Sequence, residues 1–301
     1  MRKRLPVLIV VAVLVAAVVM IMKPDWRTKG YFTVEREWAA HWPFTRGAAL
    51  PSRFKSIVRP TAPAWFTIAP SMTMLLDPED YVSAEIIRTG EWEPESWAAI
   101  AKHLPAGGVF VDVGAHIGYY SLKAAPVVGA AGHVIAVEPN PPTILELENN
   151  IRASGATAII NVQPVACSDA EATLDLFAAP RRNTGQSSLS KSNASQAGHD
   201  VTTYHVRARP LDDIIREAGV SRVDVVKIDV EGAEMLVLKG SVNTLARYHP
   251  MVIVELLDAQ LRAMGSSEAE VRAFMRAHGY AVSGAPGGDN FEFDWNEAAA
   301  H

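Results

Sequence analysis

The chain has 301 residues, 49% of them hydrophobic and 20% charged, so it can bury a large core in one domain with extensions or in two small domains. Its formal net charge of −5 argues against a nucleic-acid partner, because phosphate binding relies on a surplus of lysine and arginine. The single cysteine, Cys167, excludes an internal disulfide framework and a multi-cysteine metal site.

The first predicted element is a membrane anchor within residues 1–22. Leu5 to Met22 carries no charge, and as a helix it would span roughly 27 Å, close to a bilayer core of about 30 Å. The residues that end this stretch offer no small-x-small cleavage site, which favours an uncleaved anchor over a signal peptide. A buried core helix is the other alternative. Basic residues flank both sides, so charge does not decide the orientation.

Residues 23–80 form a predicted juxtamembrane arm, and residues 81–301 the main domain. The arm is aromatic and basic, which suits either a membrane interface or packing onto the main domain. Trp65 to Leu76 contains strand-like runs broken by Pro70. Val82 to Gly90 and Glu95 to His103 are predicted helices.

A βαβ unit follows at residues 109–138. Its parts are an apolar strand (Val109 to Val113), a glycine-flanked turn, a helix (Tyr119 to Ala125) and a second strand (His133 to Val137). Gly114 and Gly118 allow a sharp turn and a close approach to a ligand. Glu138 ends the second strand, where it can accept hydrogen bonds from ribose hydroxyls.

The turn indicates which nucleoside-bearing cofactor this unit would hold. It runs from Asp112 through His116 to Gly118 and lacks the middle glycine of the dinucleotide fingerprint. A carboxylate at Asp112 would repel a pyrophosphate, whereas it suits a cationic ligand. The pattern therefore favours S-adenosylmethionine over NAD, with a turn that binds nothing as the remaining alternative.

Strands and helices continue to alternate after this unit. Pro141 to Ser154 is a predicted helix, and Ala158 to Ala166 a strand followed by Ser168 and Asp169. Thr173 to Phe177 and Val201 to Arg207 form a predicted strand pair around a long polar segment, Pro180 to Asp200, typical of a lid, a binding loop or disorder. The later predicted elements are a helix (Leu211 to Ala218), a strand (Val223 to Val230), a helix (Glu231 to Ala246), a strand (Met251 to Leu257), a helix capped by Ser267 (Glu268 to His278) and a hairpin (Tyr280 to Ser283 with Phe291 to Asp294).

This alternation predicts a doubly wound, mostly parallel α/β sheet. Ligands of such sheets bind beyond the carboxyl ends of the strands, where Asp112, Glu138 and Asp169 lie. Another charged cluster, Lys227 to Glu234, occurs at the end of a later strand. Asp229 closes that strand beside the cofactor pocket, whereas Glu231 and Glu234 fall in the first turn of the predicted helix, where they serve either the helix dipole or the reaction. The cluster could alternatively hold a divalent cation.

The stretches VDVGAHIGYYS, EPN, VACSD and KIDVEGAE, in this order, resemble the FkbM-type methyltransferases, a class I, Rossmann-like group that uses S-adenosylmethionine. The resemblance covers roughly Tyr81 to Leu257. Residues Thr89 to Glu93 are similar to a glycine–aromatic–glutamate element of the family. The family usually has asparagine at the position of His116.

The resemblance implies O-methylation of a hydroxyl on a sugar, a glycan or a secondary metabolite. It implies that Asp112, Gly114 and Gly118 line the methionine end, Glu138 binds the ribose, and Ser168 and Asp169 lie against the adenine. It places Asp229 near the transferred methyl, Glu231 at the acceptor, and Ser187 to Leu189 in the acceptor cover. Asp229 is the preferred proton acceptor, with His116 and His205 as alternatives.

Two other classes of function stay open: an NAD-linked oxidoreductase, and a membrane-tethered nucleoside-binding protein without catalysis. Because S-adenosylmethionine is expected inside the cell, we expect a single-pass anchor with the catalytic domain in the cytoplasm. An anchored enzyme would act on an acceptor at the bilayer, such as a lipid-linked saccharide. The sequence predicts neither the acceptor itself nor the oligomeric state.

Overall fold

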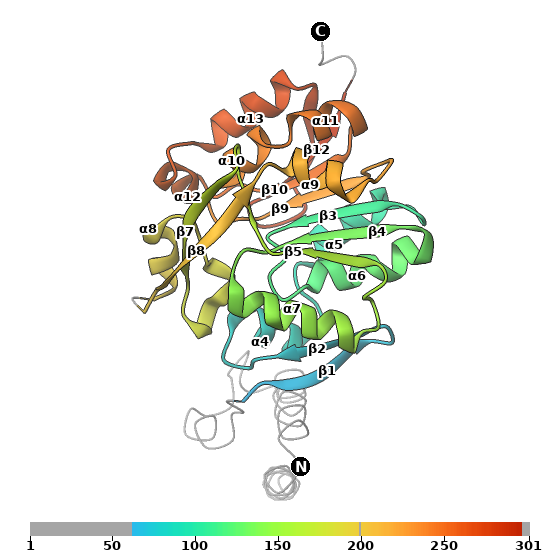
Figure 1. Cartoon of the computed structure of the whole chain (residues 1–301), viewed down its shortest axis with the longest axis vertical. Helices are drawn as coiled ribbons and strands as arrows, with labels where there is room; N and C mark the ends of the chain where they lie inside the picture. Colours follow the sequence, from blue (N-terminus) through green and yellow to red (C-terminus); the bar gives the residue numbers. More distant parts are fainter. Residues whose placement is uncertain (1–61, 199, 297–301) are drawn as a thin grey trace, which may run out of the picture. The chain divides into compact units, whose positions relative to one another are not determined.

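The computed structural model describes residues 62–198 and 200–296 (Figure 1). The chain divides into two compact units, whose described parts are residues 62–68 with 73–92, and residues 69–72 with 93–296. The predicted anchor and residues 23–61 of the predicted arm lie outside the described residues. Among the described residues, none of the helices has the length and apolar character needed to cross a bilayer.

The first unit is built around a short sheet and one helix. β1 (Ala64–Ala69) pairs with β2 (Met72–Leu76), so the predicted break at Pro70 is confirmed. α4 (Tyr81–Thr89) begins at Asp80, whose side chain accepts a hydrogen bond from the Ser83 amide, and ends at Gly90 in the left-handed conformation. The predicted helix at this place is therefore confirmed.

The second unit contains the predicted doubly wound sheet. Seven strands of its described part lie in the order β11-β12-β10-β9-β3-β4-β5. The pairs from β10 through β5 are parallel, whereas β12 runs antiparallel to both β10 and β11. The strands are β3 (Val109–Val113), β4 (His133–Val137), β5 (Ile160–Gln163), β9 (Val225–Ile228), β10 (Met251–Glu255), β11 (Tyr280–Gly284) and β12 (Asn290–Trp295). The last two form the predicted hairpin.

Helices cover both faces of this sheet (Figure 1). Among the described residues, a large core cluster joins alternate strand residues such as Val111, Val226 and Val252 to four helices: α9 (Leu211–Ala218), α10 (Glu234–Lys239), α11 (Val242–Tyr248) and α13 (Glu268–Ala277). Because side chains alternate along a strand, Phe110 and Asp112 point to the other face, where α6 contacts β3 and β4. The helices on that face include α5 (Pro94–His103) and α6 (Tyr119–Val128), while α7 (Pro141–Ala153) follows β4.

A smaller sheet lies between β5 and α9 in the sequence. β6 (Ala166–Cys167), β7 (Ala172–Ala178) and β8 (Thr202–Arg209) are ordered β6-β8-β7, and the predicted β7–β8 pair is confirmed. The predicted single strand over Ala158 to Ala166 is wrong. It is divided into β5 and β6 because Pro164, which has no amide hydrogen to donate, interrupts the pairing.

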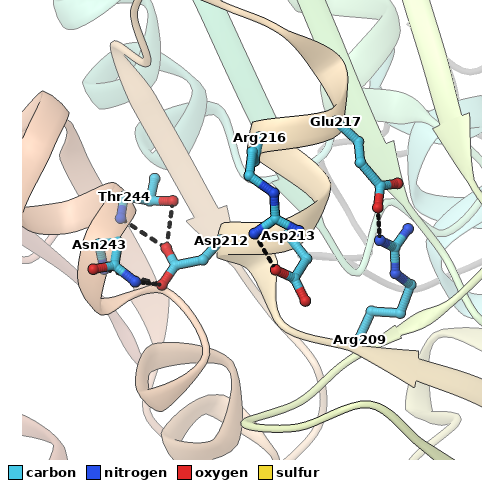
Figure 2. Close-up of polar contacts among 7 residues, drawn as sticks. All are labelled: Arg209, Asp212, Asp213, Arg216, Glu217, Asn243 and Thr244. Atoms are coloured by element: carbon cyan, nitrogen blue, oxygen red, sulfur yellow. Dashed lines mark hydrogen bonds and ion pairs between the residues drawn. The ribbon is translucent and has the colours of Figure 1, made fainter.

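The predicted helix over Glu231 to Ala246 is also wrong, because it forms two helices, α10 (Glu234–Lys239) and α11 (Val242–Tyr248). At the break, a Cβ on Gly240 would lie 2.1 Å from the Ser168 carbonyl oxygen. Figure 2 shows the carboxylate of Asp212, from α9 (Leu211–Ala218), accepting hydrogen bonds from Asn243 and Thr244. These contacts satisfy the free amides at the start of α11.

The remaining described elements are short, apart from α13. The polar segment after β7 contains η2 (Arg181–Gln186), α8 (Lys191–Ala194) and η3 (Ser195–Ala197), and η1 (Gly129–Ala131) follows α6. α12 (Asp258–Ala263) comes after β10. α13 (Glu268–Ala277) begins at Ser267, whose side chain accepts a hydrogen bond from the Glu270 amide, so the predicted cap is confirmed.

Candidate functional site

Asp112 lies at the carboxyl end of β3, directly across from Lys227 of β9. Its side chain is 1% exposed, and Oδ2 accepts a hydrogen bond of 2.7 Å from the Ser121 hydroxyl. Oδ1 is buried and has no hydrogen-bond partner among the described residues. Burial raises the pKa of Asp112, and the charge of Lys227 opposes that rise. A buried acceptor without a donor is the kind of group that a ligand ammonium would satisfy.

The two glycines of the turn are required by the protein's own packing. Gly114 and Gly118 have φ values of 83° and 91°, which favour glycine. A Cβ on Gly114 would lie 1.8 Å from the Asp229 carbonyl oxygen, and a Cβ on Gly118 would lie 2.5 Å from Leu147 Cδ1. The structure therefore gives both glycines a role in closing the turn, independent of a ligand.

Glu138, at the end of β4, organises the loops around it. Oε2 accepts the His116 amide hydrogen and Oε1 accepts the Asn140 amide hydrogen, each at 2.9 Å. Burial raises the pKa of Glu138 to about 7, against the effect of these two bonds. Each oxygen keeps a second lone pair, so the carboxylate can still accept hydrogen bonds from two hydroxyls. Asn140 Oδ1 is a further buried acceptor without a partner in the described chain.

His116 adopts a left-handed backbone, with φ of 51°. Histidine, like asparagine and aspartate, tolerates this region better than most residues. The His116 Nε2 atom lies 2.8 Å from the Thr184 hydroxyl, so the ring connects the turn to the segment after β7.

A charged network continues from Asp112 across β9. Lys227 is 3% exposed, and its Nζ donates to Asp229 Oδ2 at 2.9 Å. The ammonium also lies 4.9 Å from the centre of the Tyr120 ring, and the Tyr120 hydroxyl donates to Glu93 Oε2 at 2.7 Å. Burial alone would lower the pKa of Lys227, but the carboxylates of Asp229, Asp112 and Glu93 outweigh it and raise that pKa.

Three carboxyl groups meet at the ends of β9 and β10. One oxygen from each of Asp229, Glu231 and Glu255 lies within 4.8 Å of the others. Burial would raise the pKa of Asp229, but Lys227 holds it below its usual value. Burial and the charge of Asp229 raise the pKa of Glu231 to about 8. The site therefore contains a strongly held anion beside a group that titrates near neutral pH.

The sequence predicted Glu231 and Glu234 in the first turn of one helix, but only Glu234 lies in a helix. Glu231 precedes α10 in a left-handed turn with φ of 55°, and its Oε2 accepts a 2.6 Å hydrogen bond from Gln260 Nε2. Glu234 is the first residue of α10, and its Oε1 accepts the amide hydrogens of Val230 and Gly232. Glu234 thus supports the turn, whereas Glu231 presents its carboxylate to the cluster.

The segment from Arg181 to Ala197, which we call the cover segment, contacts both halves of the site. On the cofactor side, Ser187 Oγ accepts a hydrogen bond from Asn140 Nδ2 at 3.3 Å, beside the His116 contact described above. On the carboxylate side, Ser188 Oγ and Asn193 Nδ2 donate to the Glu231 carbonyl oxygen at 2.7 and 3.0 Å. Asn193 Nδ2 also lies 3.1 Å from the Gln260 carbonyl oxygen.

Not every predicted site residue joins this arrangement. Ser168 donates its hydroxyl to Asp169 at 3.2 Å and its amide to the Arg209 carbonyl, so its described contacts are with β8 and α10. The His205 side chain is 77% exposed and pairs with Asp175. Cys167 is buried, and burial raises the pKa of its thiol to about 12.

The sequence analysis did not assign Glu255, Glu93, Tyr120, Gln260 or Asn193 to the site. Glu255 could have been found, because it is the acid that ends an apolar strand, as Glu138 does. The other four come from helices or loops whose positions around the strand ends depend on the tertiary fold.

The strand order, with antiparallel β12 between β10 and β11, and the glycine turn between β3 and α6 define a class I, Rossmann-like methyltransferase fold. The profile described as "Methyltransferase FkbM domain" matches residues 112–282, more than half of the chain. The chain belongs to the FkbM methyltransferase family, and this membership supports an S-adenosylmethionine-dependent methyltransferase.

Several known proteins are similar to the chain. It is 32% identical over 152 residues to the hexuronic acid methyltransferase AglP of Haloferax volcanii, covering 49% of this chain and 55% of AglP. It is 29% identical over 162 residues to the methyltransferase sdnD of Sordaria araneosa, covering 46% and 62%. It is 28% identical over 210 residues to the AMB antimetabolite synthetase AmbE of Pseudomonas aeruginosa, covering 60% of this chain and 10% of AmbE. The chain thus spans less than two thirds of each relative.

Among solved structures, the chain is similar to a methyltransferase FkbM from Methylobacillus flagellatus KT. The TM-score is 0.43 at 17% identity, with 72% of this chain and 62% of that chain covered.

Proposed function

We propose that the protein transfers a methyl group from S-adenosylmethionine to a hydroxyl of a sugar, a glycan or a secondary metabolite. The observation that carries this proposal is the meeting of two groups of acids at adjacent strand ends. Asp112 and Glu138 lie on β3 and β4, and the carboxyl cluster lies on β9 and β10. The name of one relative, a hexuronic acid methyltransferase, supports a saccharide acceptor.

The first group of acids fits the cofactor. S-adenosylmethionine supplies a methyl group bound to a positively charged sulfur, together with an ammonium group and a ribose. The unpartnered Asp112 Oδ1 suits the ammonium, and the two free lone pairs of Glu138 suit the ribose hydroxyls. Gly114 and Gly118 form the tight turn beside these acids, and Ser168 and Asp169 remain our candidates for the adenine contact.

The second group of acids fits the acceptor. An O–CH₃ bond forms as the sulfur–methyl bond breaks, and the hydroxyl proton must pass to a base. Asp229, the base expected from the sequence, is a weak proton acceptor because the Lys227 ammonium stabilises its ionised form and lowers its pKa. Glu231, with its pKa near 8, is better matched to a base at neutral pH, so we assign the proton to Glu231 and the orientation of the hydroxyl to Asp229. His116 serves as a contact to the cover segment rather than as a base.

The test uses the full chain in detergent with S-adenosylmethionine. Candidate acceptors are free uronic acids, neutral hexoses and a membrane lipid extract, and the product is detected as a mass increase of one methyl group. Calorimetry with S-adenosylhomocysteine measures binding separately. Absence of heat with either form of the cofactor would refute the proposal. Turnover that persists in EDTA would exclude a divalent cation at the carboxyl cluster.

We also propose that Leu5 to Met22 anchors the enzyme in a membrane and that residues 81–301 form a cytoplasmic methyltransferase domain. The support is the length and apolar character of that stretch and the cellular location of the cofactor. Protease digestion of sealed membrane vesicles of known orientation tests this arrangement. A catalytic domain digested only from the outer side would contradict it.

A further inference from the structure

Glu255, the last residue of β10, is placed against Asp229. One oxygen of each side chain belongs to the carboxyl cluster, whose members lie within 4.8 Å of one another. Three charged groups interact electrostatically with Glu255. The Lys227 ammonium and the Asp229 carboxylate come from β9 and its end, and the Glu231 carboxylate comes from the turn that follows. One positive charge among three carboxyl groups leaves net negative charge, which disfavours ionisation of all three.

Carboxyl groups this close can form a hydrogen bond with each other only when one of them carries a proton, because two ionised carboxylates are both acceptors. Asp229 is committed to the anionic form, since Lys227 Nζ donates to it at 2.9 Å and is itself buried. The partner on β12 that pairs with Glu255 is Asn290, which carries no charge. The proton therefore belongs on Glu255.

We propose that Glu255 is a positioning residue of the acceptor site, which keeps its proton at neutral pH and donates a hydrogen bond to the Asp229 carboxylate. This role rests on the proposed methyl transfer. Lys227 and Glu255 then both donate hydrogen bonds to the Asp229 carboxylate. Asp229 therefore stays ionised and orients the acceptor hydroxyl. The proton of that hydroxyl goes to Glu231, and Glu255 keeps its own proton throughout.

The electrostatics agree with this geometry. The charge of Asp229, followed by burial and the charge of Glu231, raises the pKa of Glu255 to about 10. Glu234 from α10 acts on Glu231, and Glu93 at the start of α5 acts on Lys227. Glu234 and Glu93 therefore change the electrostatic potential near Asp229 and Glu255 only indirectly, and the proton still belongs on Glu255.

Carbon-13 NMR of the full chain in detergent, labelled at the side-chain carboxyl carbon of glutamate, tests the proposal without acceptor or cofactor. The resonance of Glu255 is identified as the one missing from E255Q, and E171Q, at an exposed glutamate, serves as the matched control. We expect the Glu255 signal to keep the protonated chemical shift at pH 8 and to change only above it. A Glu255 signal that is already ionised at pH 7 would overturn the proposal.

A second measurement separates positioning from a general structural role. With aspartate labelled, the Asp229 signal (missing from D229N) is followed in E255Q and E255L. The glutamine amide still donates to Asp229, so its pKa should stay low in E255Q and rise in E255L, where the donor is lost. An equal Asp229 pKa in both variants would refute the hydrogen bond. Because neither measurement uses the cofactor, failure of the proposed methyl transfer would be seen separately, in the calorimetry and product assays.

Discussion

Removal of the Lys227 ammonium, as in K227M, should strongly destabilise the protein. The side chain is 3% exposed and donates to Asp229 at 2.9 Å, so its loss leaves a buried carboxylate without its counter-ion. Breaking a buried ion pair in this way costs about 3–5 kcal/mol. For a domain of this size, the expected fall in Tm is roughly 6–20 °C.

The penalty should depend on pH, and its sign follows from Asp229. In the native protein the pKa of Asp229 lies below its unfolded value, so Asp229 contributes stability above that unfolded value and loses it as the pH falls. K227M lacks this contribution, because burial then raises the pKa of Asp229. The difference in the free energy of unfolding between the native chain and K227M should therefore be larger at pH 8 than at pH 4.

Urea unfolding of both proteins at the two pH values measures this difference. K239M, at an exposed lysine, is the matched control and should change stability by less than about 0.5 kcal/mol. The double variant K227M/D229N should recover part of the loss, because the unpaired charge is gone. A double variant whose loss equals the sum of the single losses would show that the two side chains are not coupled, and the reasoning would fail.

Four further changes have defined outcomes. G114A should abolish measurable binding of S-adenosylhomocysteine in calorimetry, since its Cβ would lie 1.8 Å from a main-chain oxygen. The control is G219A, at a left-handed glycine with no atom within 4 Å, which carries only about 1–2 kcal/mol of backbone strain; equal effects of the two changes would contradict this. The affinity of the native protein for the cofactor should increase as the pH rises through about 7, where Glu138 ionises. E138Q should lose this pH dependence, and a dependence that persists in E138Q would show that Glu138 does not cause it. E231Q should reduce turnover by about 10²–10⁴-fold with cofactor affinity preserved, and loss of that affinity would reassign Glu231 to binding. N193A should lower the free energy of unfolding, measured by urea titration, by about 1–3 kcal/mol, because it removes a buried donor to two carbonyl oxygens. An unchanged free energy of unfolding would mean that these two hydrogen bonds contribute little.

Local sequence patterns predicted most of the fold, because glycine, proline and apolar periodicity act over a few residues. The β3–α6–β4 unit and the β11–β12 hairpin were found in this way. The division between α10 and α11 was not, since it depends on Asp212, which precedes the break by about thirty residues, and on packing of Gly240 against Ser168. Such breaks are set by tertiary contacts that a helical period does not reveal.

The site was predictable to the extent that its acids end strands. Asp112, Glu138 and Asp229 could be assigned to one edge because the strands are parallel. Which of the acids accepts a proton could not be predicted, because it depends on the Lys227 contact and on Glu255, a residue of another strand. Glu231 was placed in a helix that begins three residues later, and only the left-handed turn aims its carboxylate at the cluster.

The cover segment has a consequence for how this fold acquires new substrates. Its described side-chain contacts with the turns of the site are hydrogen bonds that involve Thr184, Ser187, Ser188 and Asn193. The apolar cluster beneath its flanking strands is separate from the one that stabilises the large sheet. An insert exchanged between β7 and β8 would therefore have to keep these four side chains and the packing of Leu189 on the smaller cluster, whereas the core of the large sheet would need no change.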